Sequence, residues 1–434
     1  MSKKLLMINL LFVILIVFLV FILYPLDPQP SMMKENETKI SLRITTMFAG
    51  TDPATIVYEN ALQEFMESYP NVKIIDESLP AGDMFRRKVK TDFAAGNEAD
   101  VTFFFTGMDA YTLISTGRVL PFDSFLEEDL EWKNGFSKTV LNEVRHTDGL
   151  LYALPVTGFY EGLFCNQDLF DKFHVPLPTT WENLLYAIEV FSNQNIIPIA
   201  ASLDESYYLI DAFLLSAGGT GKRLSQLNEE TIPYWVLGLE HMKKIYEQNG
   251  FPSDCFTIKD MEAQQLFINK DAAMMVNGSW VLPTIKDKVH TIIMPFPIVP
   301  HGLADPTDII GGNTSGYFLS KRSHEDPQKQ QLALTLIHFL TQPEMIDRFA
   351  ALNYGIPATT VPLSSPCPLV QEGYKMTQNA AHLIKPIDFD MHPEAFLEIR
   401  KNLPFIMKSQ RSPQEILNEI AQTYTGTEKI ENED

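Results

Sequence analysis

The spacing of apolar residues in the first part of the chain predicts strands and helices in alternation. Residues 40–47 alternate polar and β-branched side chains, as a half-buried strand does. Apolar residues then recur at helical spacing up to Pro70, and residues 72–75 form the next expected strand. A helix is predicted over 85–95, and the apolar run 100–105 predicts a parallel strand covered on both faces. This repetition of strand and helix indicates an α/β fold.

The rest of the chain continues the pattern up to its acidic end. Further strands are expected at residues 150–155, 162–165, 195–201, 291–296 and 316–320. Further helices are expected at residues 109–117, 181–194, 206–216, 233–248, 260–269, 326–340, 343–352, 394–402 and 413–424. A loop with an apolar centre is expected at residues 300–313, and a solvated acidic tail at residues 425–434.

One stretch organises the second half of the chain: residues 266–283, with the sequence LFINKDAAMMVNGSWVLP. It begins as the end of a helix, turns at residues 269–271 and continues as a short apolar run, which predicts a buried strand. A turn is expected at Asn277 and Gly278, and Trp280 follows at once. The indole either fills the core at the end of the strand or meets a flat, partly apolar ligand, and the residues alone leave both readings open.

Length and charge limit the function classes. At 434 residues the chain exceeds the usual size of a single core, so two lobes are expected. The formal net charge of −21 argues against nucleic acid or an anionic lipid surface as the main partner, since both require a cationic patch. Cys165, Cys255 and Cys367 lie far apart, which fits neither a disulfide framework nor a zinc site.

The amino terminus predicts a membrane anchor. Lys3 and Lys4 precede residues 5–23, whose only polar member is Asn9, and this run is long enough to span a bilayer. Neither a small-residue cleavage site nor a cysteine for lipid attachment follows it. We therefore expect an uncleaved anchor over residues 1–24 and a proline-rich tether over 25–39, with the rest outside the cytoplasm. A cleaved signal peptide is the alternative.

No catalytic motif is found. The chain lacks a G-x-S-x-G nucleophile motif and an H-x-x-x-H zinc pair, so we expect neither an enzyme nor a cofactor nor a metal site. Aromatic residues do stand beside predicted turns, at the ends of strands or helices: Phe48, Phe105, Tyr160, Trp280 and Tyr354. In open α/β sheets ligands bind beyond the carboxyl ends of strands, and aromatic faces beside polar groups suit sugar rings. The alternative for each aromatic is a place in the core.

Seven segments, in order, resemble a known family. They are residues 93–101 (FAAGNEADV), 114–126 (ISTGRVLPFDSFL), 148–155 (DGLLYALP), 165–170 (CNQDLF), 180–184 (TWENL), 266–280 and 353–357 (NYGIP). The chain resembles, over roughly residues 40–424, the extracellular solute-binding proteins of ATP-driven importers, in the carbohydrate-binding family that includes maltose-binding protein. It departs from that family in its bare anchor and in Cys165, which stands where an aromatic is common.

The resemblance implies a two-lobe periplasmic-binding-protein-like fold of type II, with a hinge and an interlobe cleft behind the amino-terminal transmembrane helix. Lobe 1 is expected at about 40–156 with 301–350, and lobe 2 at about 157–300 with 351–424. By the same resemblance, Trp280 stacks on a sugar. Cleft-lining roles are expected for Phe48, Tyr160 and Tyr354, and hydroxyl-binding roles for Asp109 and Asn313.

The implied function is a monomeric receptor on the outer face of the plasma membrane. It captures a carbohydrate, an oligosaccharide or a sugar derivative, and delivers it to the permease subunits of an ABC transporter, without bond chemistry. Three alternatives stay open: a ligand sensor for a membrane signalling partner, a binding protein for a non-sugar polar solute, and an extracytoplasmic enzyme. Secretion after signal cleavage is the alternative location.

Overall fold

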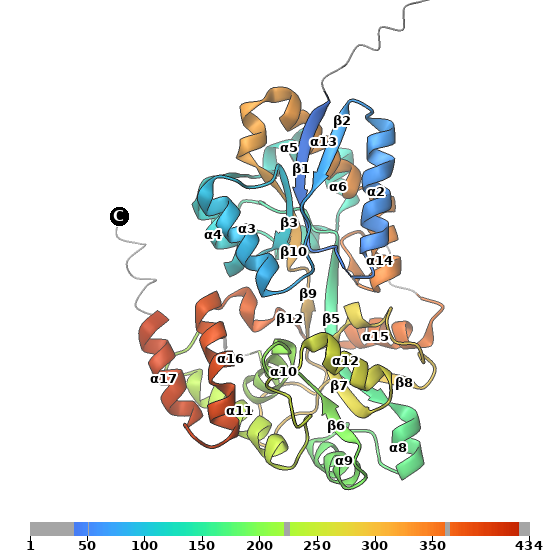
Figure 1. Ribbon diagram of the computed structural model, residues 1–434, viewed down its shortest axis with the longest axis vertical. Coiled ribbons are helices and arrows are strands. Elements are labelled where there is room, and N and C mark those ends of the chain that lie inside the picture. The colour runs from blue at the N-terminus through green and yellow to red at the C-terminus, as the bar shows by residue number, and fades with distance from the viewer. Residues whose placement is uncertain (1–38, 51, 221–225, 361–364, 425–434) are drawn as a thin grey trace, which may run out of the picture.

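Two mixed sheets, one in each of two lobes, form the framework of the protein in a computed structural model (Figure 1). The structure describes residues 39–424 except 51, 221–225 and 361–364. The predicted anchor at residues 5–23, nearly all of the tether and the acidic tail at 425–434 therefore lie outside the described residues. Within the described part of the chain, no helix is both long and apolar enough to cross a membrane.

The sheet of the first lobe has the strand order β2-β1-β3-β10-β4. Its strands are β1 (Ile40–Thr45), β2 (Val72–Asp76), β3 (Val101–Phe105), β4 (Val119–Leu120) and β10 (Ser315–Ser320). β3 is buried on both faces, as its unbroken apolar run predicts. It is parallel to β1 but antiparallel to β10, so the expectation of parallel neighbours holds on one side only.

The sheet of the second lobe is built on β5, because β7, β8, β9 and β11 all pair with this strand. Its strands are β5 (Thr157–Asn166), β6 (Ile197–Ala200), β7 (Ala272–Gly278), β8 (Thr291–Met294), β9 (Ile309–Gly312), β11 (Ile356–Pro357) and β12 (Leu383–Ile384). The buried strand predicted within residues 266–283 is β7, and every one of its residues is buried.

Helices cover both sheets (Figure 1). Those of the first lobe are α2 (Thr55–Ser68), α3 (Asp83–Ala95), α4 (Met108–Ser115), α5 (Asp123–Glu128), α6 (Leu130–Gly135), α7 (Lys138–Glu143), α13 (Pro327–Leu340) and α14 (Pro343–Asn353), with the 3₁₀ turn η2 (Lys321–Glu325). Those of the second lobe are α8 (Gln167–Phe173), α9 (Trp181–Asn193), α10 (Tyr207–Gly218), α11 (Ile232–Glu247), α12 (Asp260–Ile268), α15 (Pro368–Asn379), α16 (Pro393–Met407) and α17 (Pro413–Tyr424), with η1 (Ser279–Val281) and η3 (Ile387–Phe389).

The chain passes between the sheets at three places. It enters the second sheet at the start of β5, returns between β9 and β10, and leaves again between α14 and β11. The second passage lies at a later point in the chain than the expected lobe boundary at residues 300 and 301. Residues 301–312 were expected in lobe 1, yet β9 pairs with β5 and β12 of the second sheet. Ile309 also packs with the core around Tyr160 and Phe164.

Three local predictions were wrong for identifiable reasons. The expected loop at 300–313 contains β9, whose short Ile-Ile-Gly-Gly sequence carries no periodicity. Residues 150–155 form no strand and contribute a single bridge, between Leu154 and Tyr317. The turn expected at Asn277 and Gly278 is the end of β7, because both residues pair with β5 there.

Phe103 provides a test of the first core. Its ring is 2% exposed and lies 4.7 Å from that of Phe48 and 4.8 Å from that of Tyr317. Phe103→Ala removes this buried ring from the central strand and should lower the free energy of unfolding by about 3–5 kcal/mol. Scanning calorimetry measures the change. Phe405→Ala, at a ring that is 45% exposed, is the matched control and should leave the melting temperature nearly unchanged.

Candidate functional site

The end of β7 presents an indole beside a buried carboxyl. Glu161 of β5 stands opposite Gly278, and Trp280 follows in η1. A Cβ atom on Gly278 would lie 2.0 Å from the indole, so this glycine lets the ring lie against the backbone. Trp280 is half-buried, and its ring centroid lies 5.3 Å from that of Phe159 and 5.7 Å from that of Tyr208.

The first turn of α10 supplies the neighbouring side chains. Tyr207 is half-buried and Tyr208 is buried, and their ring centroids are 6.0 Å apart. The hydroxyl of Tyr208 donates a hydrogen bond to Asp260 at the start of α12. One turn further along α10, Asp211 accepts a hydrogen bond of 3.0 Å from the backbone N–H of Ile387. The helix therefore places the ring of Tyr208 near Trp280 and, one turn further on, a carboxyl whose charge acts on Glu161.

Two carboxyls in this region each have a buried oxygen without a hydrogen-bond partner in the described structure: Oε2 of Glu161 and Oδ1 of Asp211. The residues are 6% and 5% exposed. Burial raises the pKa of Glu161 well above its ordinary value, and the charges of Asp211 and Asp388 raise it further. The pKa of Asp211 is raised by burial and by Asp388. These oxygens can still accept hydrogen bonds from a ligand, and a bond there would offset the free-energy cost of burying a carboxylate without a partner.

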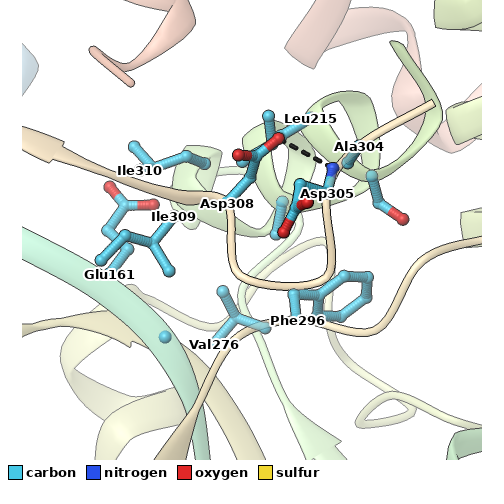
Figure 2. A pocket seen from close by; sticks show the side chains of 12 residues that line it. Glu161, Leu215, Val276, Phe296, Ala304, Asp305, Asp308, Ile309 and Ile310 are labelled. Atoms are coloured by element: carbon cyan, nitrogen blue, oxygen red, sulfur yellow. Dashed lines mark hydrogen bonds between the residues drawn. The ribbon is translucent and has the colours of Figure 1, made fainter. Parts of the chain in front are cut away.

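Glu161 also lines a small cavity that opens to solvent (Figure 2). The cavity lies between β5, β7, α10 and the loop before β9. Val276, Leu215 and Phe296 supply apolar walls, as do Ile309 and Ile310. Asp305 and Asp308 stand on the loop side, where the backbone N–H of Asp305 donates a hydrogen bond of 2.9 Å to Asp308. The cavity thus has an apolar wall with carboxyls at its edges.

The first lobe reaches this region through Arg86 of α3. Its guanidinium donates to Asp109 within its own lobe and pairs with Asp388 of η3 at 3.2 Å. It also lies 4.0 Å from the centre of the Phe105 ring. A second bridge joins Arg400 of the second lobe to Asp83 at 3.1 Å. The lobes are therefore in direct contact along the side formed by α3, η3 and α16.

Four of the six predicted site residues are buried. Phe48 is in the core of the first lobe, against the rings of Tyr58, Phe103 and Phe349. Tyr160 is fully buried beside Tyr374. Asp109 is buried and bound by Arg86 and by Lys90, the latter at 2.6 Å. Asn313, at the passage between β9 and β10, donates a hydrogen bond of 3.3 Å to Glu143, while its own oxygen has no partner.

The other two, Trp280 and Tyr354, are half-buried. Tyr354 ends α14 with a positive φ of 53°, next to the passage into β11. Trp280 follows the strand end that stands opposite Glu161, one of the two unpartnered carboxyls. The structure therefore gathers the candidate site around Trp280 and does not bring Phe48 or Tyr160 into it.

Sequence reasoning missed Glu161 by one position. Successive side chains of a strand point to opposite faces. Tyr160 faces the core with Tyr374, whereas Phe159 and Glu161 face Trp280 and Gly278. Asp211 carried a usable signal, because it is the one acid in the apolar run YYLIDAFLLS. Asp388 carried none, since its partner Arg86 is 302 positions away.

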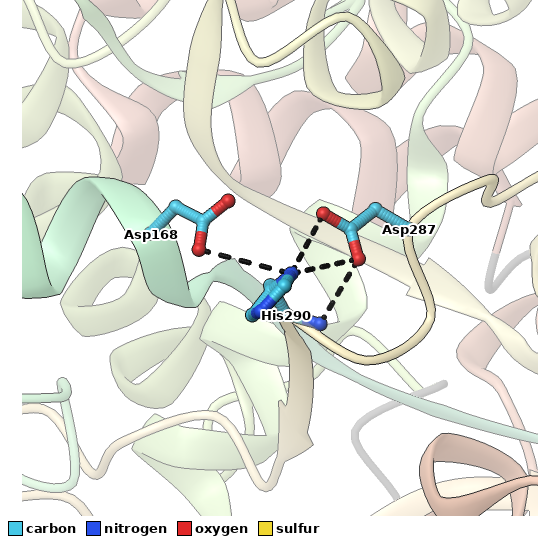
Figure 3. A group of neighbouring side chains, drawn as sticks. All are labelled: Asp168, Asp287 and His290. Carbon is cyan, nitrogen blue, oxygen red and sulfur yellow. Dashed lines mark hydrogen bonds and ion pairs between the residues drawn. The ribbon is translucent and has the colours of Figure 1, made fainter.

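A separate cluster of Asp168, Asp287 and His290 lies near the far end of β5 (Figure 3). The ammonium of Lys270 pairs with both carboxylates, at 2.7 Å for Asp287. His290 lies 3.0 Å from Asp287. The hydrogen bond from Lys270 lowers the pKa of Asp287. Because a lysine already supplies the cation here, we assign this cluster to ion pairing and propose no metal for it.

The chain matches the family of bacterial extracellular solute-binding proteins over residues 50–346. It belongs to this family. The resemblance inferred from seven sequence segments is thereby confirmed. Among curated relatives, the maltotriose-binding protein of Pyrococcus abyssi is 24% identical over 315 residues. That match spans 71% of this chain but only 65% of the relative, which is less than two thirds of the relative's length.

Two solved structures extend the comparison of this solute-binding protein. One, from work on xylan utilization by Caldanaerobius polysaccharolyticus, has a TM-score of 0.78 at 22% identity and covers 89% of this chain and 100% of the other. The second is a chitin oligosaccharide binding protein, with a TM-score of 0.77 at 21% identity and coverage of 88% and 98%. At such identities the likeness establishes the fold, so the expected two-lobed α/β fold is confirmed.

Replacing Glu161 by glutamine tests whether ionisation of this buried carboxyl opposes folding. Because the pKa of Glu161 is raised in the folded protein, its ionisation opposes folding. The wild type should lose stability as the pH rises from the ordinary glutamate pKa of about 4.3 through the raised value, and Glu161→Gln should lose less because the contribution of Glu161 is gone. The variant should therefore melt at a higher temperature at neutral pH, with a difference that vanishes toward pH ~4. Thermal unfolding across pH measures this.

Glu59→Gln, at an exposed carboxylate of α2, is the matched control for the loss of one charge. It should shift the melting temperature little at any pH. A Glu161→Gln variant that is less stable than wild type at neutral pH would show that the carboxylate is stabilised by contacts that the structure lacks.

Proposed function

We propose that this protein is an extracytoplasmic receptor that captures a carbohydrate between its two lobes and delivers it to the permease of an ABC transporter. The observation that carries the proposal is the half-buried Trp280 at the strand end opposite Glu161, which with Asp211 forms a pair of buried carboxyls with unpartnered oxygens. The names of relatives support it, because they include a maltotriose-binding protein and a chitin oligosaccharide binding protein.

The site suits the chemistry of a sugar. The face of Trp280, which is half-buried, accepts the C–H face of a pyranose ring. The free oxygens of Glu161 and Asp211 accept hydrogen bonds from its hydroxyl groups. Ring and carboxyl are close together since Glu161 pairs with Gly278, two positions before Trp280.

Ligand capture in this proposal closes the lobes. We assign residues 40–156 with 313–355 to the first lobe and 157–312 with 356–424 to the second, following the sheet pairing. A ligand that touches both lobes stabilises the closed population, because only that population offers all its contacts. Arg86 and Asp388 form one contact that closure makes.

We further propose that residues 5–23 anchor the protein to the outer face of the plasma membrane, as a monomer. The family's extracellular character supports an extracytoplasmic location. An anchor at these residues would keep the receptor near its permease. Secretion after signal cleavage is the alternative that amino-terminal sequencing of the exported protein decides.

A panel of oligosaccharides tests binding against turnover. Saturable stabilisation in a thermal-shift titration, with the sugar recovered unchanged by chromatography, is the expected result. Hydrolysis of any bound sugar would instead indicate an enzyme that uses the Glu161 and Asp211 carboxyls. If polar solutes other than sugars stabilise the protein and no sugar does, the ligand belongs to another chemical class.

Trp280→Ala tests the indole. The variant should bind the stabilising sugar at least tenfold more weakly, a loss of about 1.4 kcal/mol, because the stacking face is gone. The three other tryptophans, Trp132, Trp181 and Trp235, are buried, so a ligand-induced change in emission should vanish as well. Fluorescence titration measures both effects. Unchanged affinity in a cooperatively folded variant would assign Trp280 to the core.

A further inference from the structure

Glu161 and Asp211 form a pair of buried acids to which the protein supplies no countercharge. Neither takes part in an ion pair with any cation among the described residues. The printed hydrogen bond of Asp211 comes from the neutral backbone N–H of Ile387. Each carboxyl also lies in the electrostatic reach of Asp388. Two buried acids therefore face the ligand side without a countercharge.

The nearest cations are already engaged. Arg86 pairs with the buried carboxylate of Asp109 as well as with Asp388, and Lys90 pairs with Asp109 at 2.6 Å. Burial, together with the charge of Arg86, lowers the pKa of Lys90 to about 8, so this ammonium is close to losing its charge.

The charge of a ligand therefore affects how tightly it binds at this site. Because burial raises the pKa of Glu161 and of Asp211, both acids favour the protonated form. A cationic ligand stabilises their ionised form, whereas the anion of a uronate or of a phosphorylated sugar opposes it. A hydroxyl donates hydrogen bonds but leaves the charge uncompensated. A protonated amine does both, because it has three donors and a positive charge. The overall net charge of −21 adds attraction for a cation at a distance.

The aromatic surroundings fit the same ligand. A cation over the face of tryptophan or tyrosine is attracted by the ring quadrupole. Trp280 is half-buried and follows the strand end that stands opposite Glu161. The protein already uses cation–ring contacts nearby, where Arg86 lies over Phe105 and Arg400 over Tyr207 at 5.0 Å. The site thus offers an aromatic face for the ring and an acidic edge for a nitrogen.

We propose that the ligand is an amino sugar, whose protonated amine is held by Glu161 and Asp211. This inference rests on the proposed function as a carbohydrate receptor and narrows its ligand class. It assigns Glu161 and Asp211 as the residues that set specificity, with Trp280 as the platform for the sugar ring.

Three matched tetrasaccharides test the inference. β-1,4-linked tetrasaccharides of glucosamine, of N-acetylglucosamine and of glucose share a backbone and differ in whether the second carbon carries an amine, an amide or a hydroxyl. Calorimetric titration of the full chain at pH 6 should give at least tenfold tighter binding for the glucosamine form than for the other two. A galacturonate tetrasaccharide should bind weakest or not at all.

Variants assign the preference to the two carboxyls. Glu161→Gln and Asp211→Asn keep the size of each side chain and remove its charge. Each should reduce the advantage of the glucosamine form over the glucose form at least tenfold, while Glu59→Gln should leave the advantage intact. If either variant fails to fold, the other decides. An advantage that survives in both folded variants would assign amine recognition elsewhere and overturn the inference.

The outcomes also separate the inference from the proposed function. If the acetylated or the glucose form binds as tightly as the amine, the inference is wrong and the receptor function stands. The same conclusion follows if none of these probes binds while another sugar of the broader panel does. If no sugar of either set binds, both the inference and the carbohydrate receptor function fail.

Discussion

The pairing of β5 is the constraint on which the second lobe and the candidate site depend. This ten-residue strand begins at a passage between the sheets and changes partners along its length. Its first residues pair with β11, the next with β9, and those from Glu161 onward with β7. A strand fixed on both edges by backbone hydrogen bonds cannot slip, since a shift of one residue would turn every side chain to the other face.

That constraint explains how an unpartnered carboxyl persists in a buried position. Glu161 is held at the change of partners, where Gly278 leaves room for the indole of Trp280. The stability of the surrounding core, and not a local countercharge, offsets the free-energy cost of burying the acid. This is typical of functional sites. Asp211 is held in a similar way, on a helix that is buried along most of its length. Both acids gain stability only from a molecule that brings donors or positive charge.

Much of the fold was predictable from the sequence, but the site was predictable only in part. Periodicity located most helices and the buried strand β7, and seven short segments identified the family. Trp280 was found because a glycine turn and an aromatic follow an apolar run. Tyr160 was chosen instead of Glu161 because the true length of β5, and hence which residues alternate toward the ligand, depends on strands far along the chain. Phe48 stood at a strand end, yet it faces a core that α14 completes some 300 residues later.

Contacts between the lobes could not be predicted from the sequence for the same reason. Arg86 and Asp388 meet only when a helix of the first lobe and a 3₁₀ turn near the end of the chain are brought together. No local pattern encodes such a pair. It is this pair, with Arg400 and Asp83, that joins α3 of one lobe to η3 and α16 of the other.

The central claim is that one ligand binds between Trp280, the start of α10 and the side of the first lobe that carries Arg86. Hydrogen–deuterium exchange with and without a saturating amount of the tightest-binding oligosaccharide tests it directly. The account predicts slower exchange in residues 158–162, 207–212, 276–281 and 386–389 of the second lobe together with residues 83–90 of the first. Protection confined to one lobe, or located away from these segments, would contradict it.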